Sequence, residues 1–169
     1  MKRLIIFCLS LLLGGCVGIP DNVEPVRDFD ANRYLGTWYE IARLEHSFEK
    51  GLEKVTARYS LREDGGIKVV NRGFDPDSGK WKESVGKAYF VGDAHTGRLK
   101  VSFFGPFYGG YNIIFLGKDY SYSVVCGPGR DYLWILAREP KMAEPLLAEL
   151  VTKVKALGFD ADKLIFVKQ

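Results

Sequence analysis

The sequence predicts an all-β domain, an eight-stranded antiparallel up-and-down barrel with one C-terminal α-helix packed on its outside. Between residues 36 and 138, runs rich in Val, Ile, Tyr, Phe and Thr recur about every ten residues, and each is bounded by Gly, Pro, Asp or Asn. Most connections between these runs are short turns, which favours the pairing of neighbouring strands in sequence order. A pattern with helical spacing follows the last run.

The composition is typical of one globular domain. The chain has 169 residues, of which 47% are hydrophobic and 14% aromatic. The 24 Lys and Arg nearly balance the 21 Asp and Glu and are interspersed with them, so we expect no nucleic-acid partner. His46 and His95 have no neighbours at metal-ligand spacing, and each is expected to lie exposed in a loop. We therefore expect no metal and no cofactor.

The N-terminal residues are typical of an export signal. Lys2 and Arg3 precede an apolar segment, residues 4–13, that is too short to span a bilayer. Leu13-Gly14-Gly15-Cys16 then resembles the lipobox of bacterial lipoproteins. This resemblance implies that a signal peptide, residues 1–15, is removed and that Cys16 becomes an N-acyl diglyceride cysteine carrying chains such as palmitate, which attach the protein to the membrane. Since Val17 stands where aspartate would retain a lipoprotein in the inner membrane, we expect a lipid-anchored protein of the cell outer membrane that faces the periplasm.

The segment after the lipobox is predicted to be an acylated tether and lead-in, residues 16–33. Pro20 and Pro25 interrupt regular structure there. Asp30 is a suitable N-cap for one short helical turn. The barrel domain is then expected to span residues 34–169.

Two of the connections between the predicted strands are longer than the others. The strands are expected at residues 37–44, 54–62, 67–74, 82–91, 98–104, 111–116, 120–126 and 132–138. Residues 45–53 follow the first strand, and residues 105–110 follow the fifth. Because such odd-to-even connections share one rim of an up-and-down barrel, we predict that they form its mouth.

The C-terminal segment contains one amphipathic helix. Between residues 146 and 157 the apolar side chains fall on one face at about 100° per residue. Pro145 is tolerated in a first helical turn, and Gly158 is a natural stop. The apolar face needs one partner surface, most simply the outer wall of the barrel. A last apolar run at residues 164–167 is expected to add a short edge strand.

Three motifs carry a resemblance to a known family. Gly36-Thr37-Trp38-Tyr39, which opens the first strand, resembles the G-x-W-Y signature of lipocalins. Asp131-Tyr132 resembles the second motif of that family, and Arg138 resembles the arginine of the third. Together with the lipobox, residues 26–169 look most like the bacterial lipocalins, which are outer-membrane lipoproteins. The resemblance implies a protein that binds, stores or transports hydrophobic ligands and that is not an enzyme.

Large side chains must close one end of a barrel of this size. Eight antiparallel strands enclose space for about one small ligand, and water has to be excluded from the closed end. Trp38 and Arg138 suit this plug, because a guanidinium stacks on an indole face while its donors bind backbone carbonyls. We interpret both as structural rather than catalytic.

Strand alternation predicts which side chains line the lumen. An inward Trp38 turns Glu40 and Ala42 inward, and an inward Arg138 does the same for Leu136 and Trp134. The small residues expected on the inner face, Ala42, Ala57, Gly86 and Ala88, leave volume that a filled core would not. Aromatic residues in the two longer connections are expected at the mouth. The predicted ligand-binding residues of lumen and mouth are Glu40, Ala57, Tyr59, Phe103, Phe107, Tyr108, Tyr132, Trp134 and Leu136.

An aromatic pocket with one carboxylate and several phenols suits an amphiphile, most simply a fatty acid or a lysophospholipid. Its acyl chain would enter the barrel and its head group would stay near the rim, because a second carboxylate beside Glu40 would be unfavourable. Two alternatives stay open. The first is an envelope structural protein whose rim contacts a protein partner, and the second is a lipid-modifying enzyme that uses Cys126, Glu40 or a histidine. We interpret Cys126 as a plain buried thiol, and a homodimer is also left open.

Overall fold

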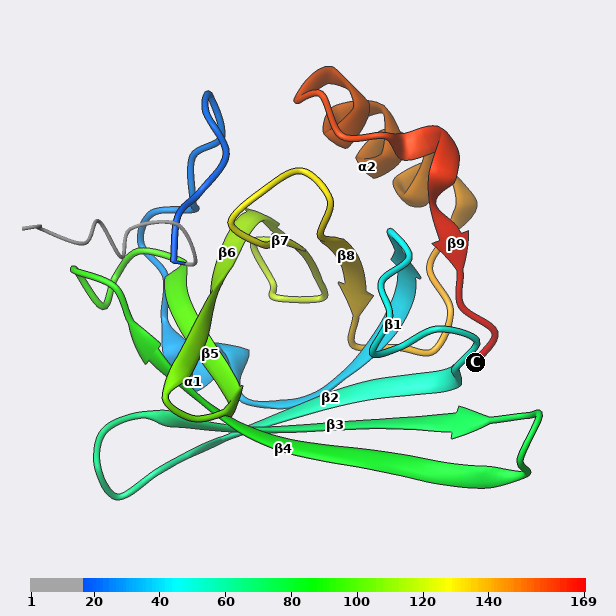
Figure 1. The fold of residues 1–169 in the computed structure, drawn as a ribbon. Coiled ribbons are helices and arrows are strands. Elements are labelled where there is room, and N and C mark those ends of the chain that lie inside the picture. The colour runs from blue at the N-terminus through cyan, green and yellow to red at the C-terminus, as the bar shows by residue number, and fades with distance from the viewer. Residues whose placement is uncertain (1–16) are drawn as a thin grey trace, which may run out of the picture.

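In the computed structural model, which describes residues 17–169, eight antiparallel strands form a closed barrel (Figure 1). β1 pairs with both β2 and β8, which closes the sheet on itself. This confirms the predicted barrel. The strands are β1 (Gly36–Arg43), β2 (Glu53–Leu61), β3 (Ile67–Asp75), β4 (Lys80–Phe90), β5 (Arg98–Phe104), β6 (Phe107–Leu116), β7 (Tyr122–Cys126) and β8 (Leu133–Ala137).

The helical elements flank the barrel. α1 (Ala31–Tyr34) is one short turn, and the side chain of its N-cap Asp30 accepts a hydrogen bond from the backbone N–H of Asn32 at 2.9 Å. α2 (Glu144–Ala156) lies outside the barrel in Figure 1, as predicted. A 3₁₀ turn, η1 (Ala161–Lys163), follows it. The short β9 (Ile165–Phe166) then adds an edge to β1. Within the described part of the chain, no helix has the length and apolarity needed to cross a membrane.

Two hydrophobic cores result from this arrangement. The inner core fills the barrel and includes Phe29, Trp38 and Tyr59. The outer core lies between the barrel wall and α2, where Leu150 and Val154 are fully buried. Since the apolar face of α2 is covered by this wall, the helix has the one partner surface that its pattern required.

The segment that precedes the barrel is packed on it. The predicted signal peptide, residues 1–15, and Cys16 lie outside the described residues. Past them, the backbone N–H of Val26 donates to the carbonyl of Ile113 on β6 at 2.8 Å. Val23 and Phe29 are buried, one in each core. Most of the lead-in therefore lies along the barrel.

Two expectations about local geometry are wrong. A β-bulge between Glu40 and Ala42 interrupts the alternation of β1, so Ala42 faces the outer core and Arg43 points inward instead. The connection expected at residues 105–110 is only a two-residue turn, Gly105-Pro106, because Phe104 pairs with Phe107 and the ladder resumes at Gly109. The first error arises because the alternation of residue types does not show where a bulge adds a residue, and the second because the glycine-rich residues 105–110 were expected to be a loop although β6 begins at Phe107.

The two ends of the barrel differ. The connections 44–52, 76–79, 105–106 and 127–132 meet at one end, which we call the mouth. The other end, which holds α1, is the closed end. The ladder between β3 and β4 continues to Lys80, whereas the ladder between β4 and β5 stops at Lys87. The β3–β4 hairpin therefore extends away from β5 on the mouth side (Figure 1).

Candidate functional site

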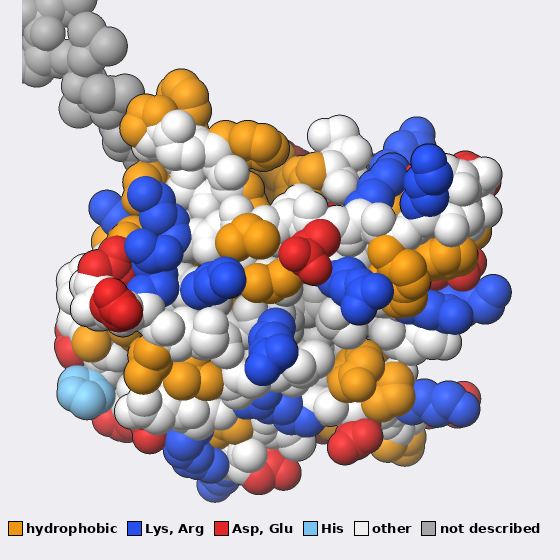
Figure 2. All heavy atoms as spheres, turned by 90° about the horizontal axis from the view of Figure 1, so that it is seen from below, with side chains coloured by type: hydrophobic (Ala, Val, Ile, Leu, Met, Phe, Trp, Pro, Cys, Tyr) orange, Lys and Arg blue, Asp and Glu red, His pale blue; other side chains and the backbone are white. Residues whose placement is uncertain are grey.

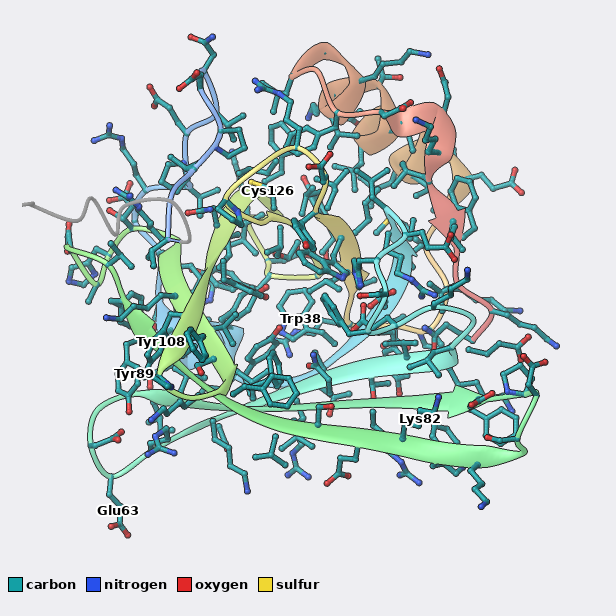
Figure 3. The ribbon with its side chains drawn as sticks, in the orientation of Figure 1. Trp38, Glu63, Lys82, Tyr89, Tyr108 and Cys126 are labelled. Atoms are coloured by element: carbon teal, nitrogen blue, oxygen red, sulfur yellow. The ribbon has the colours of Figure 1, made fainter. Side chains whose placement is uncertain are left out.

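The closed end is sealed by a cation–π pair. The Arg138 guanidinium carbon lies 3.9 Å from the centre of the Trp38 ring, which points into the barrel (Figure 3). Arg138 also donates to three backbone carbonyls, those of Arg33 at 2.7 Å, Thr37 at 3.0 Å and Tyr120 at 3.3 Å. One side chain thus ties together α1, β1 and the connection before β7.

Three tyrosines occupy the closed half of the lumen. The hydroxyl of Tyr111 lies 2.9 Å from that of Tyr34 and 2.8 Å from that of Tyr59, within hydrogen-bond distance of both. Tyr34 also bonds Ser123, and burial raises the pKa of Tyr34 to about 12, so the group stays neutral. The cavity left beside Tyr59 and Tyr111 has a volume of about 10 Å³. That space holds at most about one water molecule.

A cluster of buried ionisable groups lies on the mouth side. Arg43 Nη1 donates to Glu40 Oε1 at 2.8 Å, and its Nη2 donates to the backbone carbonyl of Glu49 at 2.8 Å. Trp134 Nε1 donates to Glu49 Oε2 at 3.1 Å. His46 Nε2 lies 3.2 Å from the same carboxylate oxygen. The β1–β2 connection thereby carries two polar side chains onto the inner wall of the barrel.

Burial controls the protonation of this cluster. Desolvation, and then the charge of Glu49, raise the pKa of Glu40, while Arg43 lowers it in part. Desolvation also raises the pKa of Glu49. Desolvation and the charge of Arg43 lower the pKa of His46 to about 4, so this histidine is neutral at pH 7. The carboxyl groups of Glu40 and Glu49 therefore share one guanidinium, that of Arg43. This arrangement favours a state in which one of the two carboxyl groups keeps its proton.

Aromatic rings form the inner edge of the mouth. The ring centres of His46 and Phe48 are 3.9 Å apart and stacked, and His46 also packs 5.1 Å from Trp134 and 5.9 Å from Tyr132. The expectation of an exposed His46 is wrong, because this stack buries it. Phe48 covers His46 and is itself 59% exposed. His95 is exposed.

The predicted lumen residues fall into two groups. Ala57, Tyr59, Phe103, Trp134 and Leu136 belong to the inner core, and Glu40 belongs to the buried ionisable cluster. The others lie nearer to solvent. Tyr132 stacks on Trp134 at the mouth, and Phe107 is exposed at the β5–β6 turn.

Tyr108 was predicted at the mouth and lies elsewhere. It alternates with its inward neighbours on β6 and packs on the outer wall, 6.3 Å from Tyr89 between ring centres (Figure 3). The Lys100 ammonium lies 4.9 Å from its ring. The prediction failed because it treated residues 105–110 as a loop.

Arg43, Glu49 and Tyr111 were not among the residues predicted to line the lumen. Arg43 enters the lumen through the β-bulge, and Glu49 through the fold of a connection, so neither carries a periodic signal. Tyr111 could have been found, because it pairs with Leu99, which lies on the same face of β5 as the Phe103 that alternation predicts to point inward.

Other features do not point to catalysis or metal binding. Burial raises the pKa of the Cys126 thiol to about 12, and this side chain lies in the outer core. Within residues 17–169, no group of three or more His, Cys, Asp or Glu is placed to hold a metal ion. A groove of about 520 Å³ lies outside the barrel between the closed end and the start of α2, lined in part by Tyr120, Arg138 and Leu146.

Comparison with known proteins gives consistent matches. The lipocalin-like domain family matches residues 29–169. The chain is 57% identical over 150 residues to outer membrane lipoprotein Blc of Escherichia coli K12, which covers 89% of this chain and 85% of the relative. It is 51% identical over 170 residues to outer membrane lipoprotein Blc of Vibrio cholerae, covering 100% and 99%. Insecticyanin from the tobacco hornworm shares the fold, with a TM-score of 0.72 at 21% identity over 90% of this chain and 87% of that one.

Proposed function

This chain belongs to the lipocalin family, and on that premise we propose that it takes up fatty acids or lysophospholipids in its barrel and stores or transports them at the outer membrane, attached through Cys16. It is an outer-membrane, lipid-anchored lipocalin for hydrophobic ligands, because relatives that are 51–57% identical to it are outer membrane lipoproteins. It is a binding protein and not an enzyme.

The observation that carries the proposal is the cluster of buried ionisable groups at the mouth side of a lumen that is otherwise lined mainly by aromatic and aliphatic side chains. Glu40, Arg43 and Glu49 lie there, while Ala57 and Val101, which stand midway along β2 and β5, contribute small or aliphatic surface to the inner core. This change from polar to apolar surface along the barrel suits an amphiphile, because each buried methylene contributes about 0.8 kcal/mol and the head group needs polar partners.

The acyl chain is expected in the mouth half of the barrel. The hydrogen-bonded Tyr34, Tyr59 and Tyr111 fill the closed half and leave little space. Phe103 and Trp134 are only partly buried in the inner core, and they are the side chains that we expect to move aside for a ligand.

The buried cluster makes the two ligand classes distinguishable. A fatty-acid carboxylate would add a third carboxyl group to Glu40 and Glu49, so its binding should be accompanied by proton uptake and should weaken as the pH rises. A lysophosphatidylethanolamine carries an ammonium group, which can donate hydrogen bonds to the carboxylates of Glu40 and Glu49. Its affinity should hold or increase over the same range.

The test is calorimetric titration of the protein with each lipid at pH 6 and pH 8.5, repeated in buffers of different ionisation enthalpy. We expect saturable one-to-one binding, with proton uptake for the fatty acid only. Absence of saturable binding by both lipids would overturn the proposal and favour a rim used for protein contact.

Two neighbouring positions on β2 provide a matched pair of variants for this titration. Ala57→Phe fills the lumen and should abolish binding. Arg58→Phe adds the same ring to the outer, exposed face of the same strand and should leave the affinity unchanged. Equal effects of the two variants would place the ligand outside the barrel.

A further inference from the structure

Exposed hydrophobic side chains are concentrated at one end of this molecule. Among residues 17–169, the exposed large hydrophobic residues on the mouth side are Phe48, Trp81, Phe104, Phe107, Tyr132 and Phe166. Val85 lies midway along β4, and only Leu61 lies at the closed end. Solvent alone gives no reason for such a bias, because isolated exposed apolar residues are normally scattered.

The β5–β6 turn is the most apolar point of this end. Phe104 and Phe107 pair directly across the turn and are 80% and 78% exposed. The segment from residue 103 to residue 110 contains no charged side chain. The barrel side seen in Figure 2 is different, since Lys, Arg, Asp and Glu side chains separate its hydrophobic ones. Exposed aromatic side chains on an uncharged hairpin are suited to the interface of a lipid layer.

The chain reaches the barrel wall on the same side. The carbonyl of Gly18 accepts a hydrogen bond from Asn112 Nδ2 at 3.0 Å, and Asn112 pairs with Cys126 at the mouth end of β7. The contact is close, because a Cβ added at Gly110 would lie 2.6 Å from that carbonyl oxygen. Gly18 follows Cys16 by two residues, which span at most about 7 Å.

These positions limit how the barrel can face the membrane that anchors it. From Gly110, beside the entry point of the chain, three residues of β6 lead to Phe107, a rise of about 10 Å toward the mouth. An acylated Cys16 keeps Gly18 within about 7 Å of the lipid surface. The β5–β6 turn projects beyond Gly18 by a similar length and can reach the same surface.

We propose that the mouth docks on the phospholipid leaflet that holds the acyl chains, with Phe104 and Phe107 inserted at its interface. A ligand would then pass between leaflet and lumen without crossing bulk water. The inference rests on the proposed anchoring through Cys16 and adds an interaction surface to the proposed ligand binding. We favour a leaflet over a second copy of the chain, because a projecting two-residue turn offers little flat area for a stable protein interface.

The test uses the full acylated protein in phosphatidylethanolamine and phosphatidylglycerol vesicles. A single cysteine at Phe104→Cys or Leu61→Cys carries an environment-sensitive fluorophore, since Cys126 is buried and unavailable for labelling. Leu61 is the matched control, because it is 59% exposed but lies at the closed end. We expect a blue shift and quenching by spin-labelled lipids at position 104 and neither at position 61.

Three outcomes would overturn the inference. Equal quenching at both positions would indicate side-on or random orientation, and quenching at neither would leave the mouth in water. A blue shift at position 104 that occurs without vesicles and disappears on dilution would identify a second copy of the chain as the occupant.

A transfer experiment separates this inference from ligand binding itself. Phe104→Ser should slow the loading of a fluorescent fatty acid from vesicles by at least about threefold, with the affinity for fatty acid added from water unchanged. Leu61→Ser should change neither quantity. If the unmodified protein binds no fatty acid from water, the proposed function fails, while the quenching result still decides the orientation. Equal loading rates for the two variants would contradict docking through the mouth.

Discussion

Each end of this barrel contains an arginine close to a tryptophan, but the two arginines have different surroundings. At the closed end, Arg138 covers the Trp38 ring and binds three backbone carbonyls, and it forms no salt bridge within residues 17–169. At the mouth, Arg43 faces two buried carboxyl groups, and its Nε has no hydrogen-bond partner among the described residues. His46 Nδ1 is likewise unpartnered. All three guanidinium nitrogens of Arg138 thus donate to backbone carbonyls at the closed end, whereas the cluster of Arg43 and His46 at the mouth keeps polar atoms without such partners.

Incomplete hydrogen bonding lowers stability, because each buried polar group without a partner costs about 1–3 kcal/mol. A protein keeps such groups where a ligand, ion or water completes them. The contrast between the ends therefore predicts that substitutions at the closed end act on unfolding and that substitutions at the mouth act on binding.

The largest effect is expected for Trp38→Ala. Removing this fully buried indole should lower the free energy of unfolding by about 3–5 kcal/mol. Urea denaturation measures the loss. Trp81→Ala, on the exposed β3–β4 hairpin, is the control and should cost about 1 kcal/mol or less. Equal denaturation midpoints for Trp38→Ala and the unmodified protein would refute its structural assignment.

Arg138→Lys is expected to have the next largest effect. An ammonium cannot bind three carbonyls in fixed directions, so the free energy of unfolding should fall by about 2 kcal/mol. Thermal melting measures the loss of stability, and ligand titration measures the affinity for lipid separately. The affinity of the folded fraction for lipid should be preserved, and a selective loss of affinity would place Arg138 in the binding site.

Trp134→Ala should show the opposite pattern. Its indole donates to Glu49 and stacks near His46, so its loss should weaken lipid binding about tenfold, or 1.4 kcal/mol, while the barrel stays folded. Isothermal calorimetry at pH 6 gives the affinity, and circular dichroism checks the fold. Unchanged affinity would exclude the mouth side of the lumen from the binding site.

The pH dependence of stability should change in Glu40→Gln. The pKa of Glu40 is raised in the folded state, so the stability that this group contributes is present below its unfolded pKa and is lost as the pH rises toward about 8. Removing the carboxyl group should therefore reduce the fall in Tm between pH 6 and pH 9 by about 3 °C. Glu63→Gln, at an exposed turn, should leave the fall unchanged.

The smallest effect on binding is expected for Cys126→Ala. The thiol lies in the outer core behind the barrel wall, so lipid affinity should change by less than about twofold. Fluorescence titration of the variant measures it. Loss of binding in this variant would show that the outer core and the lumen are coupled.

Much of the fold was predictable from local patterns. The alternation of β2, β5 and β8 placed Ala57, Phe103 and Leu136 inside the barrel, where the structure has them. The helical spacing of residues 146–157 located α2 and its apolar face. These elements are regular, so residue type and position along the chain determine which way each side chain faces.

The polar part of the candidate site was not predictable in the same way. Glu40 was expected to be the sole acid in the lumen, whereas Glu49 shares the cluster with it and Arg43 supplies the positive charge. Glu49 comes from an irregular connection, and Arg43 is turned inward by one extra residue in β1. Neither a loop conformation nor a bulge follows from alternation.

By itself, the sequence determined the eight strands, their order, the outer helix and the Trp38 and Arg138 positions, because each depends on periodicity or on short motifs. Only the tertiary structure decided that Arg43, Glu49 and His46 meet inside the mouth and that Phe104 and Phe107 project beside the entry point of the chain. Those contacts join residues whose separation in space depends on ladder register, and a shift of one residue exchanges the two faces of a strand.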